Sequence, residues 1–471
     1  MIFLFNYLKL VTWTSIYYFN NYKSPILTKI LIKNIREAGC VPIKFCQWVL
    51  PQLEVIYDID INDFNNLLYS GLEELYENCD HHPIGYTRET YRRDFGNDID
   101  EDYDVKEVIA SGSIGQVYRV VSKCDGCDYA LKSIHPSVIY QIFFMKVVFG
   151  LLYKIPILNK LLIKHIPINI NGFIDDFKTQ TNLVNEANNC LFFKNNYKDN
   201  NLIIIPEVIK VSENIMVMSY EEGEQLDDLD ISDYKKYKVA MYMRLFIKSN
   251  EQVYHTVHGD LHKGNWKVRL VDDKPKLVVY DYGFCWKIPH HLRDNLDYIN
   301  ETFLCLSEDN EENIIESCYL FINKCCDKAS IKKAIYETKK SSKFTDTEFL
   351  MRLIINTMRS KLLIIDPYII QSVIIHSQIL RLLERFSFVK HPEEGDDSMY
   401  ALEEYYNRRV PDVINLCKTE NAFMNYCNYL EKIYESKNIK TEGLFKYSCV
   451  ENNLSENETL KNLAIEGITF S

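Results

Sequence analysis

The pattern of apolar residues changes abruptly at Tyr103, and this change constrains the fold more than any other feature of the sequence. After it come short runs rich in β-branched residues, separated by turn residues, which predict strands. The predicted strands cover residues 104–110, 116–122, 129–134, 206–211 and 215–219, with a helix over 175–194 between the third and the fourth. Beyond Asp230 the pattern is helical to about residue 435, apart from one hairpin of residues 266–271 and 276–280. The sequence therefore predicts an α+β fold, with a small β-rich lobe followed by a large helical lobe.

The composition is that of a folded globular protein. Of the 471 residues, 47% are hydrophobic and 25% are charged, which excludes wholesale disorder. The 54 Lys and Arg residues are outnumbered by 66 Asp and Glu residues, and the resulting net charge of -12 argues against binding to nucleic acid. The 14 cysteines have no repeating spacing, so we expect free thiols in a reducing, intracellular compartment. A lone pair, Cys124 and Cys127, encloses an Asp-Gly turn and favours a hairpin over a zinc site.

Residues 258–265 read His-Gly-Asp-Leu-His-Lys-Gly-Asn and fit the pattern His-x-Asp-Leu-x-x-x-Asn of kinase catalytic loops. In that pattern the aspartate, here Asp260, accepts the proton of the acceptor hydroxyl, and the asparagine, here Asn265, binds a metal ion. Asp281 follows the predicted hairpin in an Asp-Tyr-Gly string and would supply a further oxygen ligand for Mg²⁺. Taken singly, Asp260 could be a helix cap and Asp281 a turn residue. The two strings in this order predict a kinase-like fold.

Further candidates in the predicted β-rich lobe complete a nucleotide-binding site. Lys132, in Ala-Leu-Lys on the third predicted strand, is expected to bind nucleotide phosphates and to pair with Glu186 on the following helix. Glu221 lies after the fifth strand, in the segment that would form the hinge and offer backbone groups to adenine. The loop between the first two strands would approach the phosphates, although it has fewer glycines than Gly-x-Gly-x-x-Gly. Its residues are Ala110, Ser111, Gly112, Ser113, Ile114, Gly115, Gln116 and Val117.

This loop, which reads Ser-Ile-Gly-Gln-Val at 113–117, resembles the small-residue loop of the UbiB (aarF-domain) family of atypical kinases. Lys44-Phe45-Cys46-Gln47 is similar to the family's Lys-x-Gly-Gln motif, with Cys46 in place of the glycine. The resemblance covers about residues 30 to 290. It implies a kinase-like fold with an N-terminal helical extension over the active site, in which Lys44 and Gln47 are regulatory. It also implies Mg²⁺-dependent binding of ATP or ADP and a link to quinone or prenyl-lipid metabolism at membranes.

The same resemblance suggests how the chain is divided. We expect a helical extension over residues 1–100, a kinase N-lobe over 101–225 and a helical C-lobe over 226–435. The remaining residues, 436–471, form a polar, Asn-rich tail.

The sequence departs from the family pattern at two further places that bear on the active site. Gly112 stands where the loop usually has alanine, and residues 180–182 read Gln-Thr-Asn instead of Glu-x-Asp. Because the second change removes both carboxylates, Lys44 loses its anionic partner unless Asp175 or Asp176 takes that place. This loss and the extra freedom of Gly112 favour a more conventional phosphotransferase.

Residues 1–36 contain five basic residues and no acid, and the first twenty are strongly apolar. Asn6 and Lys9 interrupt the apolar run, which therefore falls short of a clean membrane-spanning helix. An interfacial helix, a transit-like segment and a buried N-terminal helix all remain open, and with them membrane association or a mitochondrial location. A second apolar stretch, over 139–162, is expected to form a core helix followed by a loop at Pro156.

Two other functions remain as alternatives to an active UbiB-type kinase or ATPase. The string over 258–265 also suits a small-molecule kinase of the aminoglycoside or choline type, which the Lys44 motif and the loop at 113–117 disfavour. The missing carboxylates at 180–182 favour a nucleotide-binding pseudokinase scaffold without turnover, which the intact metal ligands oppose. The expected partners are the nucleotide and a membrane lipid or prenyl-quinone intermediate, while no motif identifies a protein substrate.

Overall fold

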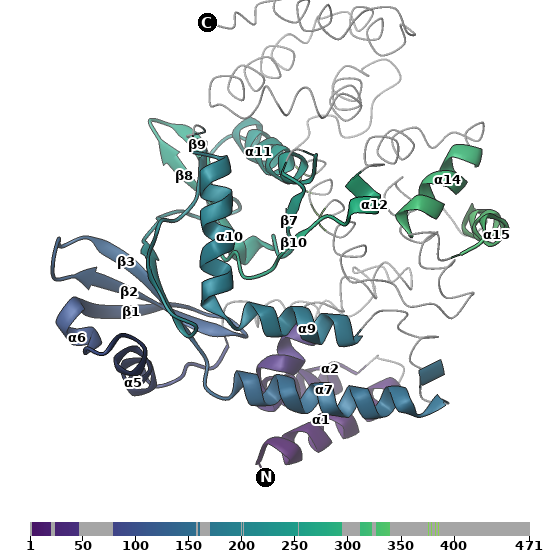
Figure 1. Ribbon diagram of the computed structural model, residues 1–471, viewed down its shortest axis with the longest axis horizontal. Coiled ribbons are helices and arrows are strands. Elements are labelled where there is room, and N and C mark those ends of the chain that lie inside the picture. The colour runs from purple at the N-terminus through teal and green to yellow at the C-terminus, as the bar shows by residue number, and fades with distance from the viewer. Residues whose placement is uncertain are drawn as a thin grey trace, which may run out of the picture.

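The computed structural model describes residues 2–19, 24–46, 79–156, 159–160, 170–198, 200, 202–252, 254–293, 311–322 and 326–339, and four single residues between 375 and 385. The predicted polar tail, Gln47 and most of the predicted helical region beyond residue 340 lie outside these residues. The described elements form an α+β arrangement, in which a sheet and a helical lobe have the helix α10 (Leu183–Asn196) between them (Figure 1). The predicted fold class is therefore confirmed.

The β-rich lobe is a five-stranded antiparallel sheet with the strand order β1-β2-β3-β6-β5. Its strands are β1 (Tyr103–Ser111), β2 (Gly115–Ser122), β3 (Asp128–Ile134), β5 (Val208–Val211) and β6 (Ile215–Ser219). On one face, Tyr118, Leu131 and Val217 form a buried cluster with Tyr91 and Ile99, which lie on helices α5 (Ile84–Phe95) and α6 (Ile99–Asp102). These two short helices fall in or near the predicted extension, yet they pack on the sheet.

The helix predicted over 175–194 is divided in the structure into α9 (Ile170–Gln180) and α10. The division falls at Asn182, whose side chain accepts a hydrogen bond from the backbone N–H of Val184, 3.0 Å away. A side-chain cap of this kind satisfies an otherwise free N–H group and so begins a new helix. The segment that lacks the family's carboxylates is therefore the junction between the two helices.

The helical lobe packs around a cluster of aromatic rings. The ring centres of Phe193 on α10 and Tyr282 lie 5.0 Å apart, and Phe246 on α11 packs on Phe193 at 5.9 Å. The described elements of this lobe, with the short strand β4, are β4 (Ile203–Ile204), α11 (Asp233–Gln252), β7 (Thr256–His258), η1 (Lys263–Asn265), β8 (Trp266–Val271), β9 (Lys274–Val279), β10 (Cys285–Lys287), α12 (His290–Arg293), α14 (Glu311–Phe321) and α15 (Lys328–Lys339). These rings hold Asp281, the residue before Tyr282, against the core.

The predicted hairpin is present as β8 and β9, but its turn is shorter than expected. Only Asp272 and Asp273 lie between the strands, with φ values of 51° and 62°. A two-residue turn with both residues in the left-handed region matches the twist of the strands, and aspartate tolerates that conformation. The second strand accordingly begins at Lys274 instead of residue 276.

The N-terminal extension contains α1 (Ile2–Phe19) and α2 (Pro25–Ala38), which lie beside α7 (Val138–Lys154) at one end of the molecule (Figure 1). Tyr7 on α1 packs edge-to-face on Phe144 of α7, with 5.6 Å between the ring centres. Although α7 buries Ile142, it exposes Phe143 and other apolar residues, so the prediction of a core helix over 139–162 is wrong for that face. A helix that is apolar on every side gives no signal of which face is covered. Among the described helices, none has both the length and the apolar character needed to cross a membrane.

Candidate active site

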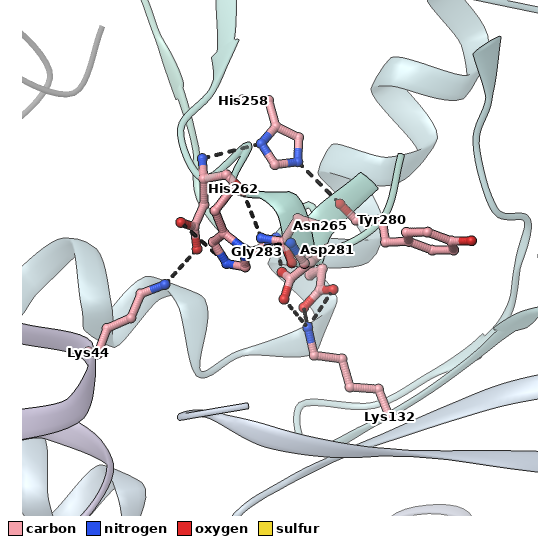
Figure 2. A network of polar contacts seen from close by, with 11 residues as sticks. Lys44, Lys132, His258, His262, Asn265, Tyr280, Asp281 and Gly283 are labelled. Carbon is pink, nitrogen blue, oxygen red and sulfur yellow. Dashed lines mark hydrogen bonds and ion pairs between the residues drawn. The ribbon is translucent and has the colours of Figure 1, made fainter. Parts of the chain in front are cut away.

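Lys132 lies at the centre of a buried group of charges. The strand β3, between β2 and β6, carries it, and its Nζ lies 2.8 Å from both carboxylate oxygens of Glu186 on α10. The same Nζ lies 3.1 Å from Oδ2 of Asp281 (Figure 2). Burial alone would lower the pKa of Lys132, but the carboxylates of Asp281 and Glu186 raise it above its ordinary value. Lys132 is therefore a buried cation that the carboxylates of Glu186 and Asp281 hold in place.

Asp281 follows β9 in a backbone conformation that is uncommon for a residue other than glycine, with φ at 49°. Its Oδ1 accepts a hydrogen bond of 3.1 Å from the backbone N–H of Gly283, which orients the carboxylate. Burial would raise the pKa of Asp281, but the positive charges of Lys132 and Lys44 lower it below its ordinary value. The group is an anion at neutral pH and is available to a cation.

The loop after β7 is held by hydrogen bonds to its own residues and to the neighbouring strand. Nδ1 of His258 accepts from the backbone N–H of Asp260 at 3.3 Å, and Nε2 of the same ring lies 3.3 Å from the carbonyl oxygen of Tyr280. Nδ2 of Asn265 donates to the carbonyl oxygen of Asp260 at 2.7 Å. The geometry therefore turns Asn265 back toward Asp260, as the spacing of the motif predicts, and His258 braces the loop.

The ion pair of Lys44 is the feature that sequence reasoning missed. Residues 40–46 are helical, and Lys44 Nζ lies 2.6 Å from Oδ2 of Asp260. Figure 2 shows Lys44 and Lys132 reaching the site from different sides. The sequence predicts that Lys44 loses its anionic partner unless Asp175 or Asp176 takes that place. In the structure the partner of Lys44 is Asp260, and Asp175 forms an ion pair with Lys146.

Lys44 forms its ion pair with the carboxylate of Asp260, the group that the motif predicts to be the base. Burial would raise the pKa of Asp260, but Lys44 and His262 lower it below its ordinary value. Lys44 is itself only 8% exposed. If Asp260 is the base that the motif predicts, a hydroxyl acceptor would need the same carboxylate oxygens for its proton and would compete with Lys44 for them.

The loop of residues 110–117 is folded back on the end of β3. The backbone N–H of Gly112 donates to the carbonyl oxygen of Gly115 at 3.0 Å, and the ring nitrogen Nε2 of His135 lies 3.0 Å from the carbonyl oxygen of Gly112. Gly115 is needed because a Cβ atom there would lie 2.7 Å from the carbonyl oxygen of Ser133. The side chain of Gln116, a predicted nucleotide-binding residue, accepts from the backbone N–H of His82 at 3.0 Å. The loop is thus tied to the segment that leads into α5.

Glu221 is fixed to the hairpin of the helical lobe. Its carbonyl oxygen accepts from the hydroxyl of Tyr280 at 2.7 Å, and its carboxylate accepts from Arg269 at 2.9 Å and from Ser219 at 2.8 Å. Arg269 also donates to the carbonyl oxygen of Glu222 at 2.8 Å. The connection after β6, which is the predicted hinge, therefore has a defined path between the lobes.

The residues present suit a magnesium ion that is shared with a nucleotide. Within the described part of the chain, no three side chains of His, Cys, Asp or Glu gather as a metal site of their own. Asp281 and the amide of Asn265 offer oxygen ligands, which Mg²⁺ prefers, and this ion usually takes one or two protein ligands and completes its shell with phosphate oxygens and water. The donor set fits that mode of binding.

Gly259 allows the chain to pass close to Trp286 just before Asp260. A Cβ atom at this position would lie 1.9 Å from a ring carbon of Trp286 and 2.9 Å from a ring carbon of Phe284. We expect Gly259→Ala to lower the free energy of unfolding by about 1–3 kcal/mol, because the rings must move. The matched control is Gly85→Ala on α5, where the added atom meets nothing within 4 Å and should not destabilise the chain. Urea unfolding measures both, and an unchanged stability of Gly259→Ala would contradict this packing.

The fold and the site together define a protein of the kinase-like class: a β-rich lobe with a buried Lys–Glu pair, above a loop that carries Asp260 and Asn265. Residues 74–318 match the ABC1 atypical kinase-like domain, and the match spans more than half of the chain. The chain belongs to the ABC1 atypical kinase family. The predicted family and class, an atypical kinase, are confirmed.

Named relatives are consistent with this assignment. The chain is 27% identical over 259 residues to the probable serine/threonine-protein kinase abkC of Dictyostelium discoideum, covering 52% of this chain and 35% of that protein. It is 24% identical over 231 residues to the probable protein kinase UbiB of Erwinia tasmaniensis, and the match covers 46% of this chain and 40% of that protein. It is 25% identical over 273 residues to the probable protein kinase UbiB of Blochmanniella pennsylvanica, and the match covers 53% of this chain and 46% of that protein. The matched region thus spans less than half the length of each of these relatives.

Among solved structures, the chain is similar to a chain in the complex of Rv3197 with erythromycin from Mycobacterium tuberculosis. The identity is 14% and the TM-score is 0.42, and the match covers 74% of this chain and 90% of that one. This likeness is too distant to carry an argument about the site.

Proposed function

We propose that this chain is a Mg²⁺-dependent, nucleotide-binding atypical kinase or ATPase of the UbiB type. The observation that carries the proposal is the position of Lys132, 2.8 Å from Glu186 and 3.1 Å from Asp281. A lysine held by a helix carboxylate beside a metal-binding aspartate is the arrangement that kinases use to place the phosphates of a nucleotide. The curated relatives named UbiB support the same type.

Each residue of the site has a role in this proposal. Asp281 and Asn265 would hold Mg²⁺, which when bound neutralises charge on the phosphate oxygens. Lys132 would bind the phosphates, and Glu186 would keep its ammonium group in place. Asp260 would accept the proton of the attacking hydroxyl or water once Lys44 has left it. The catalytic contribution of the protein is then positioning and charge stabilisation.

A prenyl lipid or quinone intermediate is the acceptor class that the proposal favours. Its support is the family resemblance together with the apolar start of the N-terminal extension, in which no acid precedes Glu37. The second candidate is a nucleotide-binding scaffold without turnover. The ion pair between Lys44 and Asp260 favours that alternative, because it occupies the proposed base.

Nucleotide titration tests the proposal. By calorimetry, we expect the full-length protein to bind ATP or ADP in the presence of Mg²⁺ and to bind it much more weakly in EDTA. Lys132→Met should weaken binding at least about tenfold, because the phosphates lose a charge-assisted contact. Lys106→Met, at an exposed position of strand β1 in the same sheet, is the matched control and should bind like the wild type.

Loss of folding must be separated from loss of binding in this experiment. Removing Lys132 leaves Glu186 and Asp281 without their shared cation, which costs stability. Glu186→Gln keeps the shape of the side chain, so it serves as the second variant, and thermal unfolding is recorded for each protein. Magnesium-independent binding, or wild-type affinity in both variants, would contradict the proposed site.

A further inference from the structure

Two histidines from separate parts of the chain contact each other beside the loop of residues 110–117. His82 lies just before α5 and His135 directly after β3, and their Nδ1 atoms are 2.7 Å apart. The two rings meet nearly at right angles, with 4.9 Å between their centres. His82 is only 6% exposed and His135 is half-buried. Ring nitrogens at this distance form a hydrogen bond, in which one donates and the other accepts. We call these two residues the histidine pair.

The surroundings of the histidine pair determine which ring nitrogens carry protons. Nε2 of His135 lies 3.0 Å from the carbonyl oxygen of Gly112, which can only accept, so this nitrogen donates. In a neutral ring Nδ1 of His135 is then the acceptor, and Nδ1 of His82 donates to it. Nε2 of His82 in turn accepts from the hydroxyl of Thr87 on α5, 2.7 Å away. The hydroxyl of Tyr118 on β2 lies 3.1 Å from the Thr87 oxygen and donates to it. One direction of donation therefore runs from Tyr118 to Gly112.

Burial keeps both rings of the histidine pair neutral at neutral pH. Burial, together with the neighbouring ring of His135, lowers the pKa of His82 to about 4. Burial also lowers the pKa of His135 below its ordinary value. No carboxylate of the described residues opposes these effects. The positions of the protons that the contacts require are therefore those of the resting protein.

The histidine pair holds the loop of residues 110–117 near both of its ends. The ring of His135 binds the carbonyl oxygen of Gly112, and its backbone N–H donates to the carbonyl oxygen of Ile114 at 2.8 Å. The side chain of Gln116 binds both backbone groups of His82, accepting from its N–H at 3.0 Å and donating to its carbonyl oxygen at 3.4 Å. The contact between the two rings joins these attachments. Gly112 gives the loop conformational freedom, and the histidine pair restricts it.

The carbonyl oxygens of the loop are bound by donors of the protein itself. Those of residues 112 and 114 accept from His135, and that of Ser111 accepts from the backbone N–H of Cys79 at 2.8 Å. In the described part of the chain, no hydrogen bond uses the backbone N–H of Ser113 or Ile114. Backbone N–H groups bind phosphates, whereas a carbonyl oxygen that faced a phosphate would repel it. The arrangement thus holds the carbonyl groups in place and leaves N–H groups for an anion.

We propose that the histidine pair positions the loop of residues 110–117 to receive the phosphates of a nucleotide. Val117, at the end of this loop, pairs with Lys132 in the sheet, so the loop lies beside the proposed phosphate-binding lysine. A loop that is ordered before the nucleotide arrives loses less conformational entropy on binding. The two histidines act through the loop and are positioning residues, not catalytic ones. This inference rests on the proposed function and assigns the histidine pair a part in it.

Calorimetric titration of the full-length protein with MgATP at neutral pH tests the role of the pair. His135→Leu removes both ring nitrogens and should bind MgATP about tenfold more weakly, with unchanged stoichiometry. His135→Gln keeps an N–H group that can reach Gly112, so its affinity should be close to that of the wild type. His82→Leu should also weaken binding. The double variant should bind no more weakly than the weaker single variant, because both residues act through one contact. His81→Leu, an exposed neighbour, is the control and should bind like the wild type.

Positioning and folding are separated by the form of the result. Partial unfolding would lower the stoichiometry of binding, whereas loss of positioning lowers the affinity, and thermal unfolding is recorded for each variant. In the wild type, ¹⁵N NMR of the histidine rings should show the proton on Nε2 of His135 and on Nδ1 of His82. Wild-type affinity in His135→Leu, equally weak binding by His135→Gln, or the opposite proton positions would overturn the proposal. If the wild type itself binds no MgATP, the proposed function fails, which is a different result from binding that the variants leave unchanged.

Discussion

Asp281→Asn is expected to remove both Mg²⁺-dependent nucleotide binding and turnover. Asparagine keeps the size of the side chain but loses the negative charge, while Lys132 keeps its contact with Glu186 at 2.8 Å. In the variant, Mg²⁺ would have only the neutral amide of Asn265 and the phosphates of the nucleotide as ligands besides water. We expect turnover to fall by at least about 10²–10³-fold, because the metal stabilises the charge of the transferred group.

Asp260→Asn should separate binding from turnover. The residue binds no metal in the proposed mechanism, so nucleotide affinity should remain near that of the wild type. Turnover should fall by about 10²–10⁴-fold, which is the usual contribution of a general base. The measurements are calorimetric titration with MgATP and steady-state release of phosphate. If both Asp260→Asn and Asp281→Asn turn over like the wild type, the site is wrongly placed.

The second large effect is expected from releasing Asp260. Lys44→Met fills the space of the lysine stem but removes the charge that lies 2.6 Å from Asp260. If the ion pair favours the state in which Lys44 contacts Asp260 by about 1.4 kcal/mol, the state in which Asp260 is released is about tenfold less populated. We therefore expect Lys44→Met to raise the rate of phosphate release at least about tenfold. Lys33→Met is the matched control on the exposed side of α2 and should leave the rate unchanged.

The pH dependence of Lys44→Met provides a second readout. In the wild type, Lys44 and His262 lower the pKa of Asp260 against the opposing effect of burial. Without Lys44 the pKa of Asp260 rises. The acid side of the pH profile of kcat/KM should therefore move to higher pH. The same lowered pKa also makes the free energy of unfolding depend on pH, because the ionised form of Asp260 is favoured more in the folded state than in the unfolded state. The pair stabilises the fold above about pH 4, and this contribution is lost as the pH falls further. An unchanged rate and an unchanged acid side of the pH profile would contradict the competition between Lys44 and an acceptor.

Much of the fold could be predicted from local patterns. The strands β1, β2 and β3 were predictable because β-branched runs alternate with turn residues over a short stretch, and their pairing follows from the short connections. The division between α9 and α10 carried a weaker signal, the polar pair Thr181 and Asn182 inside a helical pattern. Asparagine at such a place caps a new helix, but it is also tolerated within one.

The parts of the site that lie within one motif were predictable, and the contacts between distant segments were not. The spacing of residues 258–265 places Asn265 against the backbone of Asp260, as found. Lys44 and Asp260 are 216 residues apart, and no local pattern indicates that they meet. The exposure of one face of α7 could not be predicted for a different reason. Its sequence is apolar on every side, so burial on one face and exposure on the other leave no periodic signal.

We propose that Lys132, Asp260, Asn265 and Asp281 form a magnesium-dependent phosphoryl-transfer site. Steady-state release of phosphate from ATP by the full-length wild type and by Lys44→Met, in Mg²⁺ and in EDTA, tests it most directly. We expect turnover in Mg²⁺, faster turnover in Lys44→Met, and loss of turnover in EDTA for both proteins. Binding of MgATP with no turnover in either protein would contradict the claim and leave a nucleotide-binding scaffold as the function of this chain.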